Sequence, residues 1–78
     1  MPSSRTAEIR AGIEKLFLLQ ETATIEELFE AVYGRKMEYS KRRGSQAVGP
    51  ALTRYYRATG NNVRPTGDKP YTYTIEYA

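Results

Sequence analysis

The stretch SQAVGPALTRYYR, residues 45–57, contains apolar positions that recur with the period of an α-helix. Placing successive residues about 100° apart sorts the side chains into two opposite faces. The apolar face, which we expect to pack on a core, comprises Val48, Ala51, Leu52, Tyr55 and, further along, Thr59. The polar face, which we expect to meet solvent, comprises Gln46, Pro50, Thr53 and Arg57, with Arg54 beside them. The stretch therefore predicts an amphipathic helix.

Two residues inside this run, Gly49 and Pro50, are of types that normally weaken a helix. If Ser45 caps the helix, Pro50 lies in the second turn, where its ring removes at most one early hydrogen bond. The helix then continues to about Ala58. The alternative is that Pro50 itself starts a helix whose cap lies near Val48.

A first helix is predicted near the beginning of the chain. Either Ser3 or Ser4 can cap it, and it should run to about Leu18. Its apolar side chains fall on one stripe, which consists of Ile9, Ile13, Leu16 and Phe17. This stripe is expected to face the core.

A second helix is predicted over residues 25–33. Thr24 and Glu27 have the spacing of a capping box at its start, and Gly34 is a good left-handed terminator at its end. Its apolar stripe consists of Ile25, Leu28, Phe29 and Val32. We expect Leu28 to share one core with the apolar face of the third helix.

The segment GRKMEYSKRRG, residues 34–44, has no sustained apolar period, and we expect an exposed basic loop. Met37 and Tyr39 would tie this loop to the core, and a short helical turn from Ser40 is an alternative for its second half. Its basic side chains are Arg35, Lys36, Lys41, Arg42 and Arg43.

The end of the chain has the pattern of a β-hairpin. The last segment, YTYTIEY, alternates strictly, and PTGDKP before it has the composition of a turn. The expected strands cover about residues 62–64 and 71–77. The face expected to close the core against the third helix consists of Tyr71, Tyr73, Ile75 and Tyr77.

The composition limits the classes of function. A chain of 78 residues without Cys or His is a single domain, residues 1–78, with no means of forming a disulfide or a zinc finger. Glu26, Glu27 and Glu30 are best explained as a solvated helix face. We therefore expect no enzyme, no cofactor and no metal. No apolar run could cross a membrane and the start does not resemble a signal peptide, so we expect a soluble, cytoplasmic protein.

The net charge of +3 conceals an uneven distribution. Residues 1–34 carry three basic and six acidic side chains, whereas residues 35–78 carry nine basic and three acidic ones. A basic half on a small domain favours a polyanionic partner, although a run of charge is also what an ordinary solvated face looks like.

Three helices followed by a hairpin, with a short extended piece near residues 22–23, resemble the winged helix-turn-helix family in the order of their elements. The resemblance implies an α+β fold with a two-stranded β-hairpin wing. It also implies that the third helix enters the major groove of double-stranded DNA. One departure is the connection over residues 34–44, which is longer than the three or four residues typical of this motif.

The function that follows is that of a small transcriptional regulator. Gln46 and Arg57 have the chemistry to contact base edges, and loop cations have the chemistry to neutralise phosphates. Gly49, on the outer face, would let a duplex come close. The residues expected to contact DNA are Arg35, Lys36, Lys41, Arg42, Arg43, Gln46, Thr53, Arg54, Arg57, Arg64 and Lys69.

Other functions remain open at this stage. The tyrosines could stack on single-stranded bases, for which Tyr39 and Tyr56 are better placed than those of the hairpin. The chain could instead be a protein-interaction module, such as an adaptor or inhibitor on the same scaffold, or a winged domain of a replication protein. A homodimer is also open.

Overall fold

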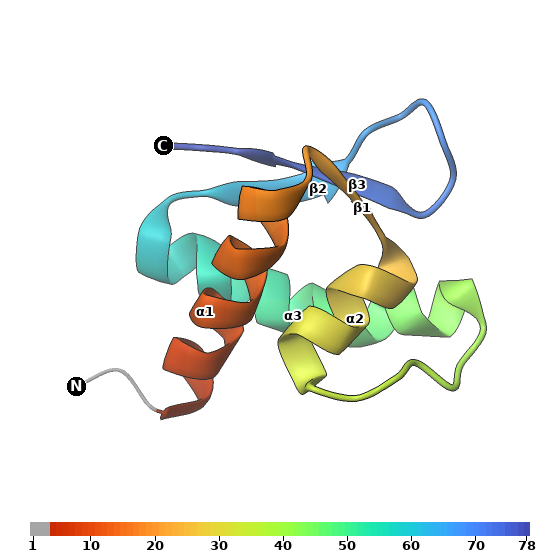
Figure 1. Cartoon of the computed structure of the whole chain (residues 1–78), viewed down its shortest axis with the longest axis horizontal. Coiled ribbons are helices and arrows are strands. Elements are labelled where there is room, and N and C mark those ends of the chain that lie inside the picture. The colour runs from red at the N-terminus through yellow and green to blue at the C-terminus, as the bar shows by residue number, and fades with distance from the viewer. Residues whose placement is uncertain (1–3) are drawn as a thin grey trace.

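The computed structural model describes residues 4–78, which form three helices and a three-stranded antiparallel sheet (Figure 1). The α+β class predicted from the sequence is confirmed. In Figure 1, α1 and α2 lie in front of α3, and the sheet covers the upper end of the helices. The elements are α1 (Ser4–Leu19), β1 (Thr22–Thr24), α2 (Ile25–Tyr33), α3 (Lys41–Thr59), β2 (Asn62–Pro65) and β3 (Thr72–Glu76).

The sheet contains the predicted hairpin and one strand more. Strands β2 and β3 pair with Val63 opposite Ile75, and β1 pairs with the other edge of β3, with Thr22 opposite Thr74. The strand order is β1-β3-β2. The expectation of a two-stranded sheet was therefore wrong, because the extended residues between α1 and α2 supply hydrogen-bonding groups to an edge that would otherwise be exposed.

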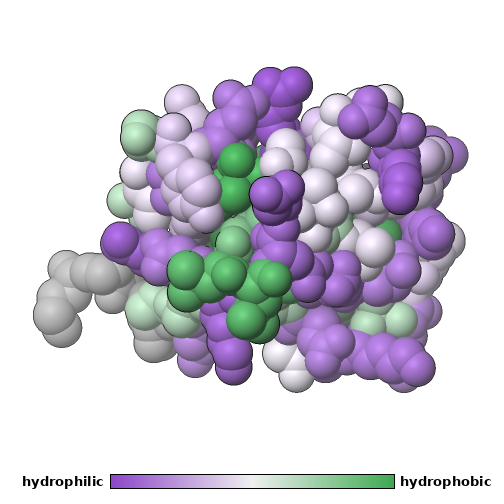
Figure 2. All heavy atoms as spheres, turned by 45° about the horizontal axis from the view of Figure 1, so that its top comes forward, coloured by the Kyte–Doolittle hydropathy of each residue, from purple (hydrophilic) through white to green (hydrophobic). Residues whose placement is uncertain are grey.

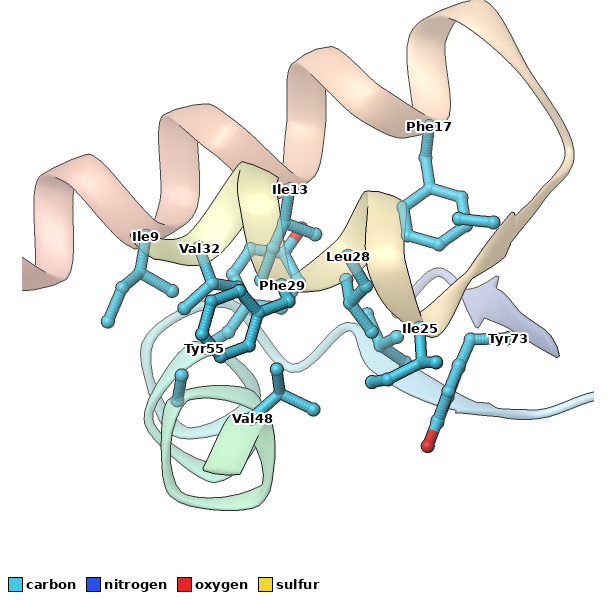
Figure 3. Packing of buried hydrophobic residues seen from close by; sticks show 13 residues of the cluster. Ile9, Ile13, Phe17, Ile25, Leu28, Phe29, Val32, Val48, Tyr55 and Tyr73 are labelled. Atoms are coloured by element: carbon cyan, nitrogen blue, oxygen red, sulfur yellow. The ribbon is translucent and has the colours of Figure 1, made fainter. Parts of the chain in front are cut away.

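One core joins the inner faces of all the elements (Figure 3). The apolar stripes predicted for α1 and α2 face it, except that Leu16 is only half-buried. Leu28 and Tyr55 belong to the core as predicted, whereas Leu52 packs against its edge and stays half-buried. The buried residues are Ile9, Ile13, Phe17, Ala23, Ile25, Leu28, Phe29, Val32, Val48, Ala51, Tyr55, Val63 and Tyr73.

Local signals at the ends of α2 act as the sequence predicts. The amide of Glu27 donates to the Thr24 hydroxyl at 3.2 Å, and the amide of Thr24 donates to the Glu27 carboxylate at 2.9 Å. Gly34 ends the helix with φ of 71°, a left-handed conformation that costs a glycine little. Helix α1 begins at Ser4, and the cap expected at Ser3 lies outside the described residues.

The start of α3 differs from the exposed loop expected over residues 34–44 and agrees with the alternative of a helical turn from Ser40. Ser40 is the cap, and its hydroxyl accepts a hydrogen bond from the amide of Arg43 at 3.3 Å. Residues 41–44 are therefore the first turn of α3, and only residues 35–40 connect the two helices. The physical reason is the Ser40 cap, which satisfies an amide of the first turn, and Gly44 in that turn is buried under Met37 without room for a side chain.

Pro50 consequently lies in the interior of α3, and both caps proposed from the sequence, Ser45 and Val48, were wrong. Because proline has no amide hydrogen, the carbonyl of Gln46 receives no helical hydrogen bond from residue 50. Gly49 makes this arrangement tolerable. A Cβ at the position before proline clashes with the proline ring in a helix, and glycine has none.

The hairpin tyrosines do not all close the core. Tyr73 is buried, but Tyr71 is 37% exposed and Tyr77 is 65% exposed, so the expectation was wrong for these two. Tyr71 has φ of 56° and lies before the first residue of β3. Its carbonyl accepts a hydrogen bond from the amide of Ile25 at 2.9 Å, which ties the hairpin to the start of α2.

The crossing of α1 and α2 depends on Gly12. A Cβ built there would lie 2.0 Å from the carbonyl oxygen of Ala31, which belongs to the backbone of α2 and cannot move aside alone. We expect Gly12→Ala to lower the free energy of unfolding by about 1 to 3 kcal/mol despite the better helix propensity of alanine. Urea denaturation measures this change. An unchanged or increased stability would contradict the close crossing.

Replacing Pro50, in contrast, is expected to stabilise the protein. Its side chain is exposed, so replacing it removes little packing and restores one helical hydrogen bond. We expect Pro50→Ala to raise the free energy of unfolding by about 1 to 3 kcal/mol, measured in the same way. A decrease in stability would show that the proline ring contributes packing that the exposed position does not suggest.

Candidate nucleic-acid interface

The outer face of α3 forms a continuous polar stripe. Its members recur at helical spacing, so they lie on one side of the helix along about 22 Å. Four of them are exposed and the glycine is half-buried. The stripe consists of Arg42, Gln46, Gly49, Thr53 and Arg57. A Cβ built on Gly49 would meet nothing within 4 Å, so the centre of the stripe is open to an approaching molecule.

Basic side chains gather before and at the start of this stripe. Arg35 and Lys36 lie in the connecting segment, and Lys41 to Arg43 occupy the first turn of α3, which has no acidic residue. None of them forms an ion pair with a carboxylate among residues 4–78. Three cations at the amino end of a helix are unfavourable, because the helix dipole there already favours negative charge.

The connecting segment, residues 35–40, is anchored to the core rather than loose. The Tyr39 ring lies edge-on to Phe29 with 5.8 Å between the ring centres. The guanidinium of Arg43 lies 5.8 Å from the Tyr39 ring centre, and that of Arg35 lies 5.7 Å from the Phe29 ring centre. Met37 packs beneath, as the sequence suggested. The backbone that carries these cations is therefore held in place.

The remaining predicted residues lie apart from the stripe. Arg54 lies on the flank of α3 toward α1, where it lines a small cavity with Arg5 and Tyr33. Arg64 forms an ion pair with Glu76 on the outer side of the hairpin. Lys69 is exposed in the turn between β2 and β3. The structure thus brings the cations of residues 35–43 together with Gln46, Thr53 and Arg57. The other three predicted residues, Arg54, Arg64 and Lys69, lie outside this group.

A shallow groove beside the stripe was not predicted. It lies between α3 and β2 and brings Asn62 next to Tyr56, whose side chain is 53% exposed. Leu52 and Val63 line it as well. Asn62 carried no signal in the sequence, because its position depends on where β2 passes α3. Tyr56 could be found from its place on the flank of the predicted helix.

The described residues lack two other kinds of feature. They hold no group of three metal-binding side chains, and none of their helices is long and apolar enough to cross a membrane. The backbone amide of Thr24 donates to the carboxylate of Glu27 and, with the side chain of Gln20, holds the pKa of Glu27 below its ordinary value. This shift belongs to the cap of α2 and not to a catalytic site.

Comparison with known proteins gives no match to a family model, to a curated protein or to a solved structure. The function is therefore inferred from the geometry and charge of the interface.

Proposed function

We propose that this chain is a winged helix-turn-helix domain that binds double-stranded DNA and acts as a small transcriptional regulator. In this proposal α3 enters the major groove, and residues 35–41 and the turn between β2 and β3 lie against the phosphate backbone. The order of the elements and the pairing of β1 with the hairpin support the assignment. The proposed role is binding, without a catalytic step or a cofactor.

The observation that carries the proposal is the absence of acidic residues from α3 itself and from the strand that follows it. No Asp or Glu occurs between Glu38 and Asp68. An ordinary solvated helix mixes both signs of charge, as α1 does where Arg10 donates to Glu14 at 3.0 Å. A helix face that carries only positive charge instead matches a partner with regularly spaced negative charge, such as the phosphates of a duplex.

The polar stripe has the chemistry to read bases. The Gln46 amide can donate to and accept from adenine, Arg57 can donate two hydrogen bonds to guanine, and the Thr53 methyl can contact thymine. Gly49 lies between them without a side chain, so the helix backbone can come close to the floor of the groove.

The cations at the start of α3 have the chemistry to hold phosphate. Lys36 and Lys41 are exposed and have no carboxylate partner among the described residues. A phosphate near Lys41 would also receive the favourable field of the helix amino end. Binding would thereby relieve the repulsion that the three first-turn cations create in the free protein.

Two arginines on α3 provide a matched pair for testing the stripe. Arg57 belongs to it and Arg54 points to the flank toward α1, so both substitutions remove one charge from the same helix. On a duplex selected from a random pool, we expect Arg57→Ala to weaken binding by about 1 to 3 kcal/mol and to reduce sequence discrimination. Arg54→Ala should cost much less. Gel shifts measure both, and equal effects would contradict the assignment of the stripe.

The phosphate-binding role is tested through the dependence on salt. Replacing Lys36 and Lys41 together by Ala should weaken all duplexes similarly and reduce the slope of log affinity against log salt by about 0.9 for each phosphate that is no longer neutralised. The control removes the same charge from α1 by replacing Arg5 and Arg10, which lie outside both the stripe and the groove between α1 and α2. The slope should then stay nearly unchanged. Equal slopes for the two double variants would mean that only the net charge matters.

Selection of bound duplexes from a random pool also distinguishes a transcriptional regulator from a replication protein. An enriched sequence motif supports a regulator, whereas tight binding without enrichment supports a winged domain of a replication protein. A second candidate function, protein interaction, is favoured by an apolar groove between α1 and α2, which lies outside the proposed DNA interface.

A further inference from the structure

A groove on the surface of α1 and α2 exposes apolar side chains. Its floor is formed where the two helices cross at Gly12 and Ala31, and Leu16 and Leu19 form one wall. Leu19 is 78% exposed. On the side of the molecule shown in Figure 2, strongly apolar side chains gather in the middle, over the carboxyl end of α1. A volume of about 410 Å³ leaves room for side chains from another molecule.

The two sides of the groove carry opposite charges. Lys15 lies on the α1 side, and Glu27 and Glu30 lie on the α2 side. Within residues 4–78 neither Lys15 nor Glu30 forms an ion pair. Glu27 is occupied by the cap of α2, which leaves Glu30 as the acidic partner offered to another molecule.

We propose that a second copy of this chain docks in this groove through a two-fold axis. Such an axis requires a surface that is complementary to itself. The groove meets this requirement, because Leu19 of each copy can enter the other copy's groove over Gly12 and Ala31. The same operation places Lys15 of each copy opposite Glu30 of the other. A partner with a single sign of charge would satisfy only one side of this rim.

The position of the groove determines what the dimer does. The groove lies between α1 and α2, whereas the polar stripe lies on the side of α3 that does not pack on the core, and α3 lies behind α1 and α2 in Figure 1. Pairing through the groove therefore leaves both stripes free and directs them away from each other. If the proposed DNA-binding function holds, the dimer joins two separate duplexes instead of reading two adjacent half-sites on one duplex.

Two neighbouring leucines provide the test. Leu19 lines the groove, whereas Leu18 is 83% exposed and lies outside it. In sedimentation equilibrium of the full chain up to about 1 mM, we expect a reversible dimer for the wild type and for Leu18→Asp. Leu19→Asp should be monomeric, with an unchanged melting curve because its side chain is already exposed. A monomeric wild type, or equal effects of the two substitutions, would overturn the proposal.

A charge exchange tests the two-fold arrangement itself. Lys15→Glu or Glu30→Lys alone should weaken the dimer at least several-fold, because each places like charges opposite each other twice. The double variant should restore it. Failure of the double variant to recover would contradict this geometry. DNA affinity of the monomeric Leu19→Asp variant on one duplex is measured separately, so a failure of dimerisation is distinguishable from a failure of DNA binding.

Discussion

Burial of Val48, Ala51 and Tyr55 fixes the rotation of α3 about its own axis, and the surface that this helix presents follows from it. Tyr55 is 1% exposed, and its hydroxyl accepts a hydrogen bond from the Asn61 side chain at 3.1 Å. The buried Tyr55 therefore leaves no unpaired polar atom in the core. A rotation of about half a turn would expose these side chains and bury Arg57, which has no partner inside the core.

The same packing determines how the cations before α3 are presented. Gly44 is buried against Met37, and Tyr39 rests on Phe29, so a segment rich in basic residues is tied to the core at two points. Such anchoring lowers the conformational entropy that a binding partner would have to remove. The aromatic contacts of Arg43 place its guanidinium at the surface beside the stripe.

Features fixed by neighbouring residues could be predicted, and features fixed by distant contacts could not. The cap of α2 is formed by Thr24 and Glu27, which are close in the sequence, and both residues were predicted. In the first turn of α3 only Gly44, under Met37, is buried, so this turn leaves no apolar period in the sequence. Strand β1 has three residues, too few for a periodic signal, and it pairs with residues about two thirds of the chain length away. For the interface, the residue types were evident, but the separation of Arg54 from Arg57 depended on the packing of α1 beside α3.

Acidic side chains on α2 and basic ones on α3 give the domain two surfaces of different character, and we propose that duplex DNA binds the second. An NMR titration of the isotope-labelled chain with a mixed-sequence duplex at low salt distinguishes the two surfaces. We expect chemical shift changes along the α3 stripe and over residues 35–41, with α1 unaffected. Changes concentrated on the outer side of α1 and α2, or no changes at saturating DNA, would contradict binding through α3.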